Sequence, residues 1–235
     1  HTAIPFAMQH ERNQPTPYSK YFVDEVDFFN SRMRDFPAMA MRVLYSVQAR
    51  KRIEALIRQT QPDVAHLHNV AHQLAPSILH ALKQHGIPVV QTAHDYKFGC
   101  PAYKFYTEGQ VCERCKGRRY YNVLLHRCNR GSLAASALNC VETYFHELIG
   151  IYNNVDSFIS PSNFLRQKMI EYGVAPERVV WIPNFIALDQ YRPEYTHGDY
   201  FLFCGRLLDI KGVRTLMAAM EFIKDPHLYV VGDGE

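Results

Sequence analysis

Short apolar runs alternate with amphipathic segments along most of this 235-residue chain. Apolar runs bounded by Pro, Gly or Asn predict buried strands at 62–70, 87–94, 155–162 and 178–184. The segments 75–86 and 163–173 predict helices between these strands, and Gly86 and Gly173 are expected to close them. This alternation predicts an α/β fold with a parallel sheet, because parallel strands need a crossover between them.

Two further segments have the period of longer helices. In 37–60 the apolar positions form one stripe, made of Val43, Val47, Ile53, Leu56 and Ile57. In 133–152 apolar residues recur every three or four positions, at Leu138, Val141, Phe145, Leu148 and Tyr152. We expect each stripe to face the core. Residues 1–36 are polar and aromatic, with breaks at Pro15 and Pro17, and are expected to form loop and short turns.

A second strand–helix–strand set follows a segment that resembles an interdomain linker. The linker, 186–199, contains Pro193 and Gly198. Beyond it we expect strands at 200–205 and 227–231 and a helix at 213–223. The chain starts without an initiator Met or a secretory signal and stops on an apolar run with a Gly turn, so both ends are expected to be cut.

Composition narrows the class of protein. With 47% hydrophobic residues, 21% charged residues and a net charge of +3, the chain is expected to be globular and not a nucleic-acid binder. No apolar run approaches the roughly 18 residues that a membrane-spanning helix needs. The six cysteines occur in a long chain without an N-glycosylation sequon, which favours a reducing, cytoplasmic compartment over a secreted disulfide scaffold.

The turn from Gly205 to Gly212 is the most informative candidate site, because it carries Arg206 and Lys211 between a predicted strand and a helix. Arginine, lysine and helix N-terminal amides together suit an anionic ligand such as a diphosphate. Two solvated loop cations are an equally good interpretation from spacing alone. Ligands of parallel sheets bind beyond the carboxyl ends of the strands. The residues that follow each predicted strand are therefore candidates: His66–His72, His94–Lys97, Ser160–Asn163, Asn184, Gly205–Lys211 and Gly232–Glu235.

An ordered set of segments resembles glycosyltransferase family 4. FLFCGRLLDIKG and YVVGDGE are similar to the opening of that family's nucleotide-sugar domain. Upstream, PDVAHLHN, the strand ending in His94, ISPSNFLRQKMIEYGV and RVVWIPNFIALDQYRP are similar, in the same order, to its acceptor-side domain. The likeness covers nearly everything after about residue 37. It implies a GT-B architecture of two Rossmann-like lobes.

The resemblance also implies roles for particular residues. Gly205, Arg206 and Lys211 would bind the donor's diphosphate and neutralise charge on the departing nucleotide. His94 would face the sugar, although a histidine after a strand is more often a packed loop residue. Three further positions match the cleft or hinge, where turn and cap chemistry is an equally good interpretation: Ser162, Asn184 and Gly232. The family retains anomeric configuration and is not expected to need a catalytic metal.

The implied domains are an acceptor-side lobe at 1–185 with a Cys-rich insert at about 99–130, a linker at 186–199, and the start of the donor lobe at 200–235. The family's first strand and its acidic E-x7-E motif are not found in the sequence, so the 235-residue chain alone is expected to be inactive. The expected substrates are a nucleotide-diphosphate sugar and a sugar or lipid-linked glycan acceptor of cell-surface polysaccharide or glycolipid synthesis. Peripheral contact with the inner face of the cell membrane is compatible with that acceptor.

The cysteine insert is a separate signal. Cys100, Cys112, Cys115 and Cys128 have the spacing C-x11-C-x2-C-x12-C, and a C-x2-C step can supply two thiolates to a structural zinc site. Two disulfides or four reduced thiols are competing interpretations. A zinc-stabilised nucleic-acid-binding module, using basic residues around Lys116 and Arg118, is therefore the alternative function.

A histidine metal site is disfavoured. His66 and His68 share a strand face and His72 follows, but no nearby carboxylate or cysteine completes a ligand set. These histidines are expected to line the core or a cleft.

Overall fold

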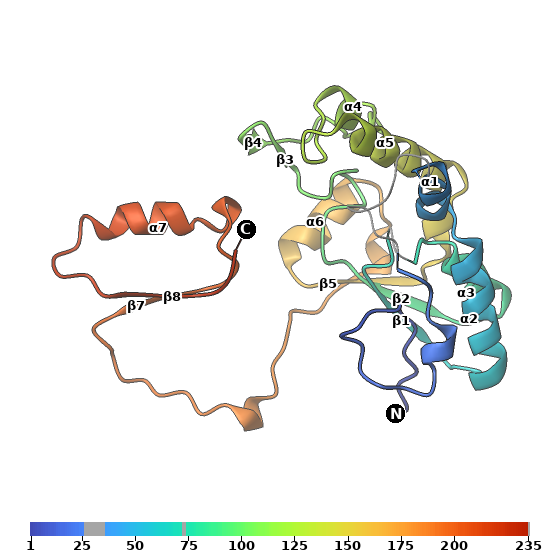
Figure 1. The fold of residues 1–235 in the computed structure, drawn as a ribbon, viewed down its shortest axis with the longest axis horizontal. Coiled ribbons are helices and arrows are strands. Elements are labelled where there is room, and N and C mark those ends of the chain that lie inside the picture. The colour runs from blue at the N-terminus through green and yellow to red at the C-terminus, as the bar shows by residue number, and fades with distance from the viewer. Residues whose placement is uncertain (26–35, 72–73, 235) are drawn as a thin grey trace. The chain divides into compact units, whose positions relative to one another are not determined.

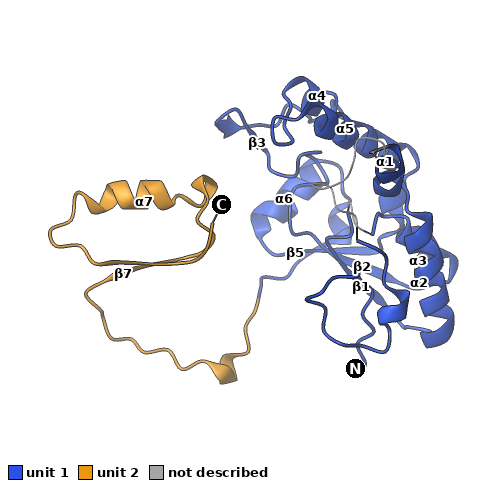
Figure 2. Cartoon of the chain, in the orientation of Figure 1, with its two compact units in different colours: residues 1–184 blue, residues 185–235 orange. Residues whose placement is uncertain are grey.

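A computed structural model describes residues 1–25, 36–71 and 74–234. The chain divides into two compact units, His1–Asn184 and Phe185–Glu235, which are coloured separately in Figure 2. No helix in the described part of the chain combines the length and the apolar character needed to cross a bilayer.

Unit 1 (residues 1–184) is built on a four-stranded parallel sheet, which confirms the predicted α/β fold (Figure 1). Its strands run in the order β1-β2-β5-β6, with bounds Ala65–His68, Val89–Thr92, Ser157–Ser160 and Val179–Trp181. His68 is level with Thr92 in the register, and Thr92 with Ile159. The carboxyl ends of β1, β2 and β5 therefore meet at one edge of the sheet.

Helices cover this sheet and bury its apolar side chains. They are α1 (Phe36–Leu44), α2 (Val47–Thr60), α3 (Ile78–Gln84), α5 (Leu133–Leu148) and α6 (Asn163–Glu171). Short 3-10 turns lie at η1 (Ser19–Tyr21), η3 (Ile151–Asn154) and η4 (Pro176–Arg178). Helices α2 and α3 pack against each other beside β1, as Figure 1 shows. The main core includes Leu79, Leu82, Val89, Ile151 and Met169.

The predicted helix 37–60 is two helices, which corrects the single stripe expected from its period. The Ser46 hydroxyl accepts a hydrogen bond from the amide of Ala49 at 3.1 Å and so caps α2. The Ser77 hydroxyl donates to the Ser46 carbonyl at 2.9 Å. The break turns Val47 outward, and 55% of it is exposed. Ile53, Leu56 and Ile57 are buried as expected.

The buried face of α5 also differs from the prediction. Val141 and Leu148 are 54% and 86% exposed. The buried residues are Ser136, Asn139, Cys140, Glu142 and His146. Hydrogen bonds offset the cost of removing these polar side chains from water. Asn139 donates to the Pro101 carbonyl at 3.2 Å, and His146 Nε2 lies 2.8 Å from the Leu44 carbonyl. The helix ends before Tyr152, which belongs to η3.

Residues 1–25 contain little regular structure but contribute to the core. Phe22 and Val23 are 3% and 0% exposed, and Val23 pairs with Met8 in an isolated bridge. The remainder of the predicted N-terminal loop, 26–35, lies outside the described residues.

The cysteine insert connects β2 to α5. It contains a small antiparallel hairpin, β3 (Tyr106–Thr107) and β4 (Gln110–Val111), and the four-residue helix α4 (Asn122–Leu125). Helix α4 packs against α5. Their contact forms a second small core around Ala102, Val123 and Cys140.

Unit 2 (residues 185–235) contains one parallel strand pair, β7 (Phe201–Cys204) and β8 (Leu228–Val231), connected through α7 (Val213–Met220). The 3-10 turn η6 (Asp209–Lys211) precedes α7. The segment before β7 is exposed and carries only η5 (Leu188–Gln190). This is the strand–helix–strand arrangement that the pattern predicted.

Candidate functional site

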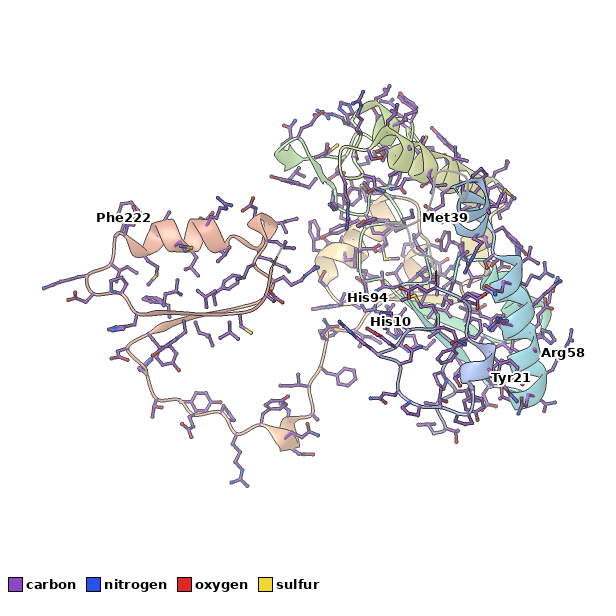
Figure 3. The ribbon with its side chains drawn as sticks, in the orientation of Figure 1. His10, Tyr21, Met39, Arg58, His94 and Phe222 are labelled. Atoms are coloured by element: carbon purple, nitrogen blue, oxygen red, sulfur yellow. The ribbon has the colours of Figure 1, made fainter. Side chains whose placement is uncertain are left out.

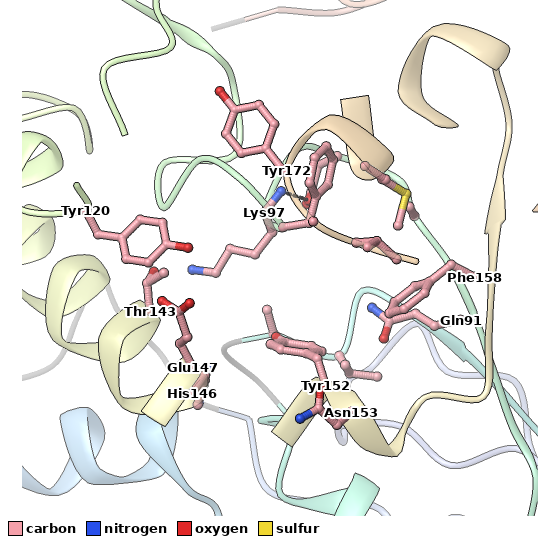
Figure 4. Close-up of a pocket in the computed structure, with 18 of the residues that line it drawn as sticks. Gln91, Lys97, Tyr120, Thr143, His146, Glu147, Tyr152, Asn153, Phe158 and Tyr172 are labelled. Carbon is pink, nitrogen blue, oxygen red and sulfur yellow. Dashed lines mark hydrogen bonds between the residues drawn. The ribbon is translucent and has the colours of Figure 1, made fainter. Parts of the chain in front are cut away.

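A cavity of about 730 Å³ opens in unit 1 at the carboxyl edge of the sheet. Its walls come from the end of β2 and the loop that follows, the cysteine insert, α5, η3, and the end of α6. Figure 4 shows Lys97 extending into this pocket, with Tyr152 and Asn153 on another side of it. The volume suits a small ligand such as a sugar.

His94 lies on the wall of this pocket, two residues beyond the end of β2 (Figure 3). Its Nε2 is 2.7 Å from Nδ1 of His68, so one of the two rings donates a hydrogen bond to the other. His66 stacks against His68 with ring centres 4.3 Å apart, and its Nε2 is 2.8 Å from the Thr92 hydroxyl. Burial, with His66 and His94 beside it, lowers the pKa of His68. A neutral His68 can therefore orient the His94 ring.

A buried ion pair supports the loop after His94. Lys97 Nζ lies 2.6 Å from Glu142 Oε2, and these side chains are 15% and 0% exposed. The Lys97 amide donates to Asp95 Oδ1 at 2.9 Å, which tightens the turn. His146 Nδ1 is 3.9 Å from Glu142 Oε1, and desolvation lowers the pKa of His146. This network links the loop to α5.

Charged side chains at the pocket wall are paired with opposite charges. Lys116 pairs with Glu171, and Arg118 Nε lies 2.5 Å from Glu147 Oε1. All four residues line the pocket. The carboxylates of Glu171 and Glu147 therefore balance the positive charges of these two basic residues of the insert.

Two other residues predicted in unit 1 do not line the pocket. The Ser162 hydroxyl accepts from the Leu165 amide at 3.1 Å and caps α6, as the alternative interpretation of this residue expected. Asn184 is exposed at the end of unit 1.

The predicted diphosphate residues lie together in unit 2, on the loop between β7 and α7. Arg206 and Lys211 are both exposed. The Leu207 amide donates to the Asp233 carbonyl at 2.9 Å and the Gly205 amide to the Val231 carbonyl at 2.9 Å, which holds this loop against the end of β8. A Cβ on Gly232 would lie 1.9 Å from the Gly205 oxygen, so this close approach requires glycine. The start of the loop is therefore held against the end of β8.

The four insert cysteines line a second, much smaller cavity of about 20 Å³. All six cysteines of the chain are free thiols. In the described part of the chain, no group of three or more His, Cys, Asp or Glu residues stands in a ready metal-binding arrangement. His72 lies outside the described residues, and no metal-binding group that includes His66 or His68 is found among the residues that the structure describes.

Sequence reasoning missed Glu142 and His146, and it placed Lys97 after a strand without giving it a role. Glu142 and His146 are one helical turn apart in α5, and two ionisable residues at that spacing in a mostly apolar helix are a readable signal. Lys97, the partner of Glu142, is 45 positions away in the chain, and no local pattern in the sequence indicates that the two residues pair.

The comparisons with known proteins agree with the sequence resemblance. The family described as Glycosyltransferase Family 4 matches residues 12–190. No curated protein is similar enough in sequence to count as a match. The matched range contains every wall of the larger pocket.

Proposed function

Because the chain belongs to glycosyltransferase family 4, we propose that it transfers a sugar from a nucleotide-diphosphate donor to a glycan acceptor with retention of anomeric configuration. The observation that carries this proposal is the position of His94, on the wall of a pocket at the carboxyl edge of the sheet. This is the edge at which parallel α/β sheets bind their ligands.

Unit 1 provides the acceptor side in this proposal. His94 donates a hydrogen bond to a hydroxyl of the reacting sugars or accepts one from it. The contact with His68 holds the His94 ring in one orientation. The carboxylates Glu147 and Glu171 are engaged in ion pairs with Arg118 and Lys116. They therefore hold the pocket wall and are not assigned as an acid and base.

Unit 2 provides the donor side. Arg206 and Lys211 bind the diphosphate, and the amide of Gly205 lies in the same loop. Two cations on this loop stabilise the negative charge that builds on the departing nucleotide, which lowers the barrier without a catalytic metal.

The proposed reaction proceeds on one face of the sugar. The bond from the anomeric carbon to the diphosphate oxygen breaks, and a bond from the same carbon to the acceptor oxygen forms. The proton of the acceptor hydroxyl passes to an oxygen of the leaving diphosphate. Retention follows because the acceptor enters from the side on which the nucleotide departs.

We place this reaction in the synthesis of a cell-surface polysaccharide or glycolipid in the cytoplasm. Support for this assignment comes from the family resemblance. A lipid-linked acceptor would bring the protein to the inner surface of the membrane. In the alternative of a nucleic-acid-binding module, Lys116 and Arg118 would have to exchange their carboxylate partners, Glu171 and Glu147, for phosphates.

The experiment is an assay of the full-length protein against a panel of nucleotide sugars and glycan acceptors. We expect acceptor-dependent release of nucleoside diphosphate, with the anomeric configuration of the product determined by NMR. His94→Ala should lower kcat by at least about tenfold, since each tenfold corresponds to about 1.4 kcal/mol of transition-state stabilisation. His85→Ala, at the exposed end of α3, is the control.

The donor side is tested separately. Arg206→Ala should raise KM for the donor and lower kcat, because the same cation binds the ground state and stabilises the leaving group. An inverted product, or a His94→Ala enzyme as active as the parent, would refute the proposal.

A further inference from the structure

The cysteine insert brings four thiols to one small cavity. Cys100, Cys112, Cys115 and Cys128 all line the space of about 20 Å³ between the β3–β4 hairpin and α4. A space of this size holds a single water-sized occupant. The insert therefore surrounds a volume suited to one ion.

Packing also brings these cysteines together. Cys100 and Cys128 pack against the small core formed by Ala102, Val123 and Cys140. Cys115 is itself buried.

Backbone hydrogen bonds hold these cysteines at the cavity. The amide of Cys100 donates to the Tyr96 carbonyl at 2.8 Å, and the amide of Cys112 donates to the Phe105 carbonyl at 2.9 Å. The amide of Cys128 donates to the Val123 carbonyl at 3.1 Å. These bonds fix the backbone of three of the four cysteines beside the cavity.

The insert contains little regular structure. It has two two-residue strands and one four-residue helix. Its own small core buries Ala102 and Val123 against Cys140 of α5, and Phe105 packs against Tyr172 beyond α6. A hairpin this short is not stable by itself, and small modules of this kind usually depend on a disulfide or a metal ion. No disulfide is present.

We propose that Cys100, Cys112, Cys115 and Cys128 bind one Zn²⁺ ion in a structural, four-sulfur site. The thiols do not stand in a metal-binding arrangement in the structure, so zinc binding requires their side chains to move toward the cavity. Each thiol loses one proton as its sulfur bonds to the ion, so four protons are released for each zinc bound. The four sulfurs complete a tetrahedron and leave no position for a reactive water.

Neighbouring charge favours this binding. Four thiolates around Zn²⁺ carry a net charge of −2, and Arg114, adjacent to Cys115 in the sequence, supplies a positive charge. The site also has a structural consequence for the larger pocket. Lys116, Gly117 and Arg118 follow Cys115 directly and line the 730 Å³ pocket. Zinc would thus fix one wall of that pocket.

His126 is the one other metal-ligating side chain on the wall of the small cavity in the described chain. Its Nδ1 lies 2.8 Å from Glu108 Oε1 and 3.1 Å from an Arg114 nitrogen. These contacts hold the ring on the hairpin side. We therefore assign the four sulfurs as ligands and leave His126 outside the set.

The test is elemental analysis of the full-length protein purified without chelators, combined with a count of free thiols after denaturation. We expect one zinc per chain. Replacement of zinc by Co²⁺ should give the intense visible bands of a tetrahedral cobalt site and a thiolate-to-cobalt charge-transfer band. Both measurements use the unmodified protein, so they do not depend on how well a variant folds.

Variants then identify the ligands. Cys112→Ser and Cys115→Ser should lower zinc to well below one equivalent and weaken the charge-transfer band. Cys204→Ser, at an exposed position in unit 2, and Cys140→Ser, beside the cluster in α5, should keep one zinc. His126→Gln should also keep it.

Several results would overturn the proposal. A zinc content near zero with all six cysteines of residues 1–235 free would show reduced thiols, and only two of these six free would show two disulfides. Loss of zinc in His126→Gln, with normal zinc in Cys112→Ser or Cys115→Ser, would exclude the four-sulfur set.

Discussion

At the scale of single residues, the buried polar face of α5 is the feature on which the pocket depends. Glu142 and His146 are 0% and 3% exposed, which is unusual for ionisable side chains. Each has a partner from another segment, Lys97 for Glu142 and the Leu44 carbonyl for His146. Such burial is tolerated because the charges are paired and hydrogen-bonded.

The Lys97–Glu142 pair yields a stability prediction. Lys97→Met should destabilise unit 1 by about 3–5 kcal/mol, because it leaves the Glu142 carboxylate buried without its cation. Lys97→Met combined with Glu142→Leu should recover most of that loss, since the charges are removed together. Urea unfolding of the two single variants and the double variant measures the coupling. Additive losses in the double variant would contradict this account.

His146 gives a prediction of pH dependence. Its folded pKa is lowered by burial from the ordinary value of 6.5, with Lys97 lowering it further and Glu142 and the Leu44 carbonyl opposing the shift. The unfolded chain therefore takes up a proton at a pH where the folded chain does not, and the free energy of unfolding should fall as pH drops below about 6.5. Once the pH is below the lowered pKa of His146 in the folded protein, the contribution of His146 to the free energy of unfolding should stop changing.

Urea unfolding as a function of pH measures this effect. His146→Gln should flatten the slope between the two pKa values, because glutamine keeps an amide donor for the Leu44 carbonyl but cannot be protonated. His85→Gln, at an exposed position, is the control and should keep the slope. An unchanged slope in His146→Gln would contradict the assignment.

At the scale of elements, the ends of β7 and β8 show how closely backbones pack at the proposed diphosphate loop. Gly232 has a φ of 153°, and its backbone touches that of Gly205. Gly212, at the start of α7, has a φ of 74° but has open space around the position of a Cβ. The two glycines therefore serve different purposes, a close approach and a left-handed turn.

This difference can be tested in the two glycines. Gly232→Ala should destabilise unit 2 and weaken nucleoside diphosphate binding, because the new Cβ must displace the Gly205 carbonyl. Gly212→Ala should cost about 1 kcal/mol, from backbone strain alone. Calorimetric binding of nucleoside diphosphate to the full-length variants compares them. Equal effects of the two substitutions would show that the close approach has no special importance.

Most elements of the sheet could be predicted from sequence, whereas the helix faces could not. The strand ending before His94 and the helix closed by Gly173 follow from local hydrophobic runs and a glycine stop. The break at Ser46 and the outward turn of Val47 depend on the contact between Ser46 and Ser77. Local periodicity does not record such a contact between segments 31 positions apart.

At the scale of the whole molecule, the chain consists of two units connected by an exposed segment. Residues 185–199 are exposed throughout, and Phe185 and Tyr195 are 89% and 90% exposed. Their backbone makes few hydrogen bonds outside η5. Such segments are cut by proteases more readily than packed elements.

Limited proteolysis tests this division. Chymotrypsin, which cleaves after aromatic residues, should cut first after Phe185 or Tyr195 and leave a resistant fragment that corresponds to unit 1. Mass spectrometry of the early fragments identifies the sites. Phe185→Ser with Tyr195→Ser should slow the first cut. Early cuts within α5 or the sheet of unit 1 would contradict the division.

The sequence by itself determined the alternation of strands and helices, the parallel sheet and the family, because these depend on local periodicity and on motifs that are continuous in the chain. It also pointed to His94. Only the tertiary structure decided that Lys97, Glu142 and His146 support the loop after His94, and that the pocket wall includes residues that follow Cys115. The physical reason is that burial and charge pairing join residues from distant segments, and no local pattern specifies which of them will meet.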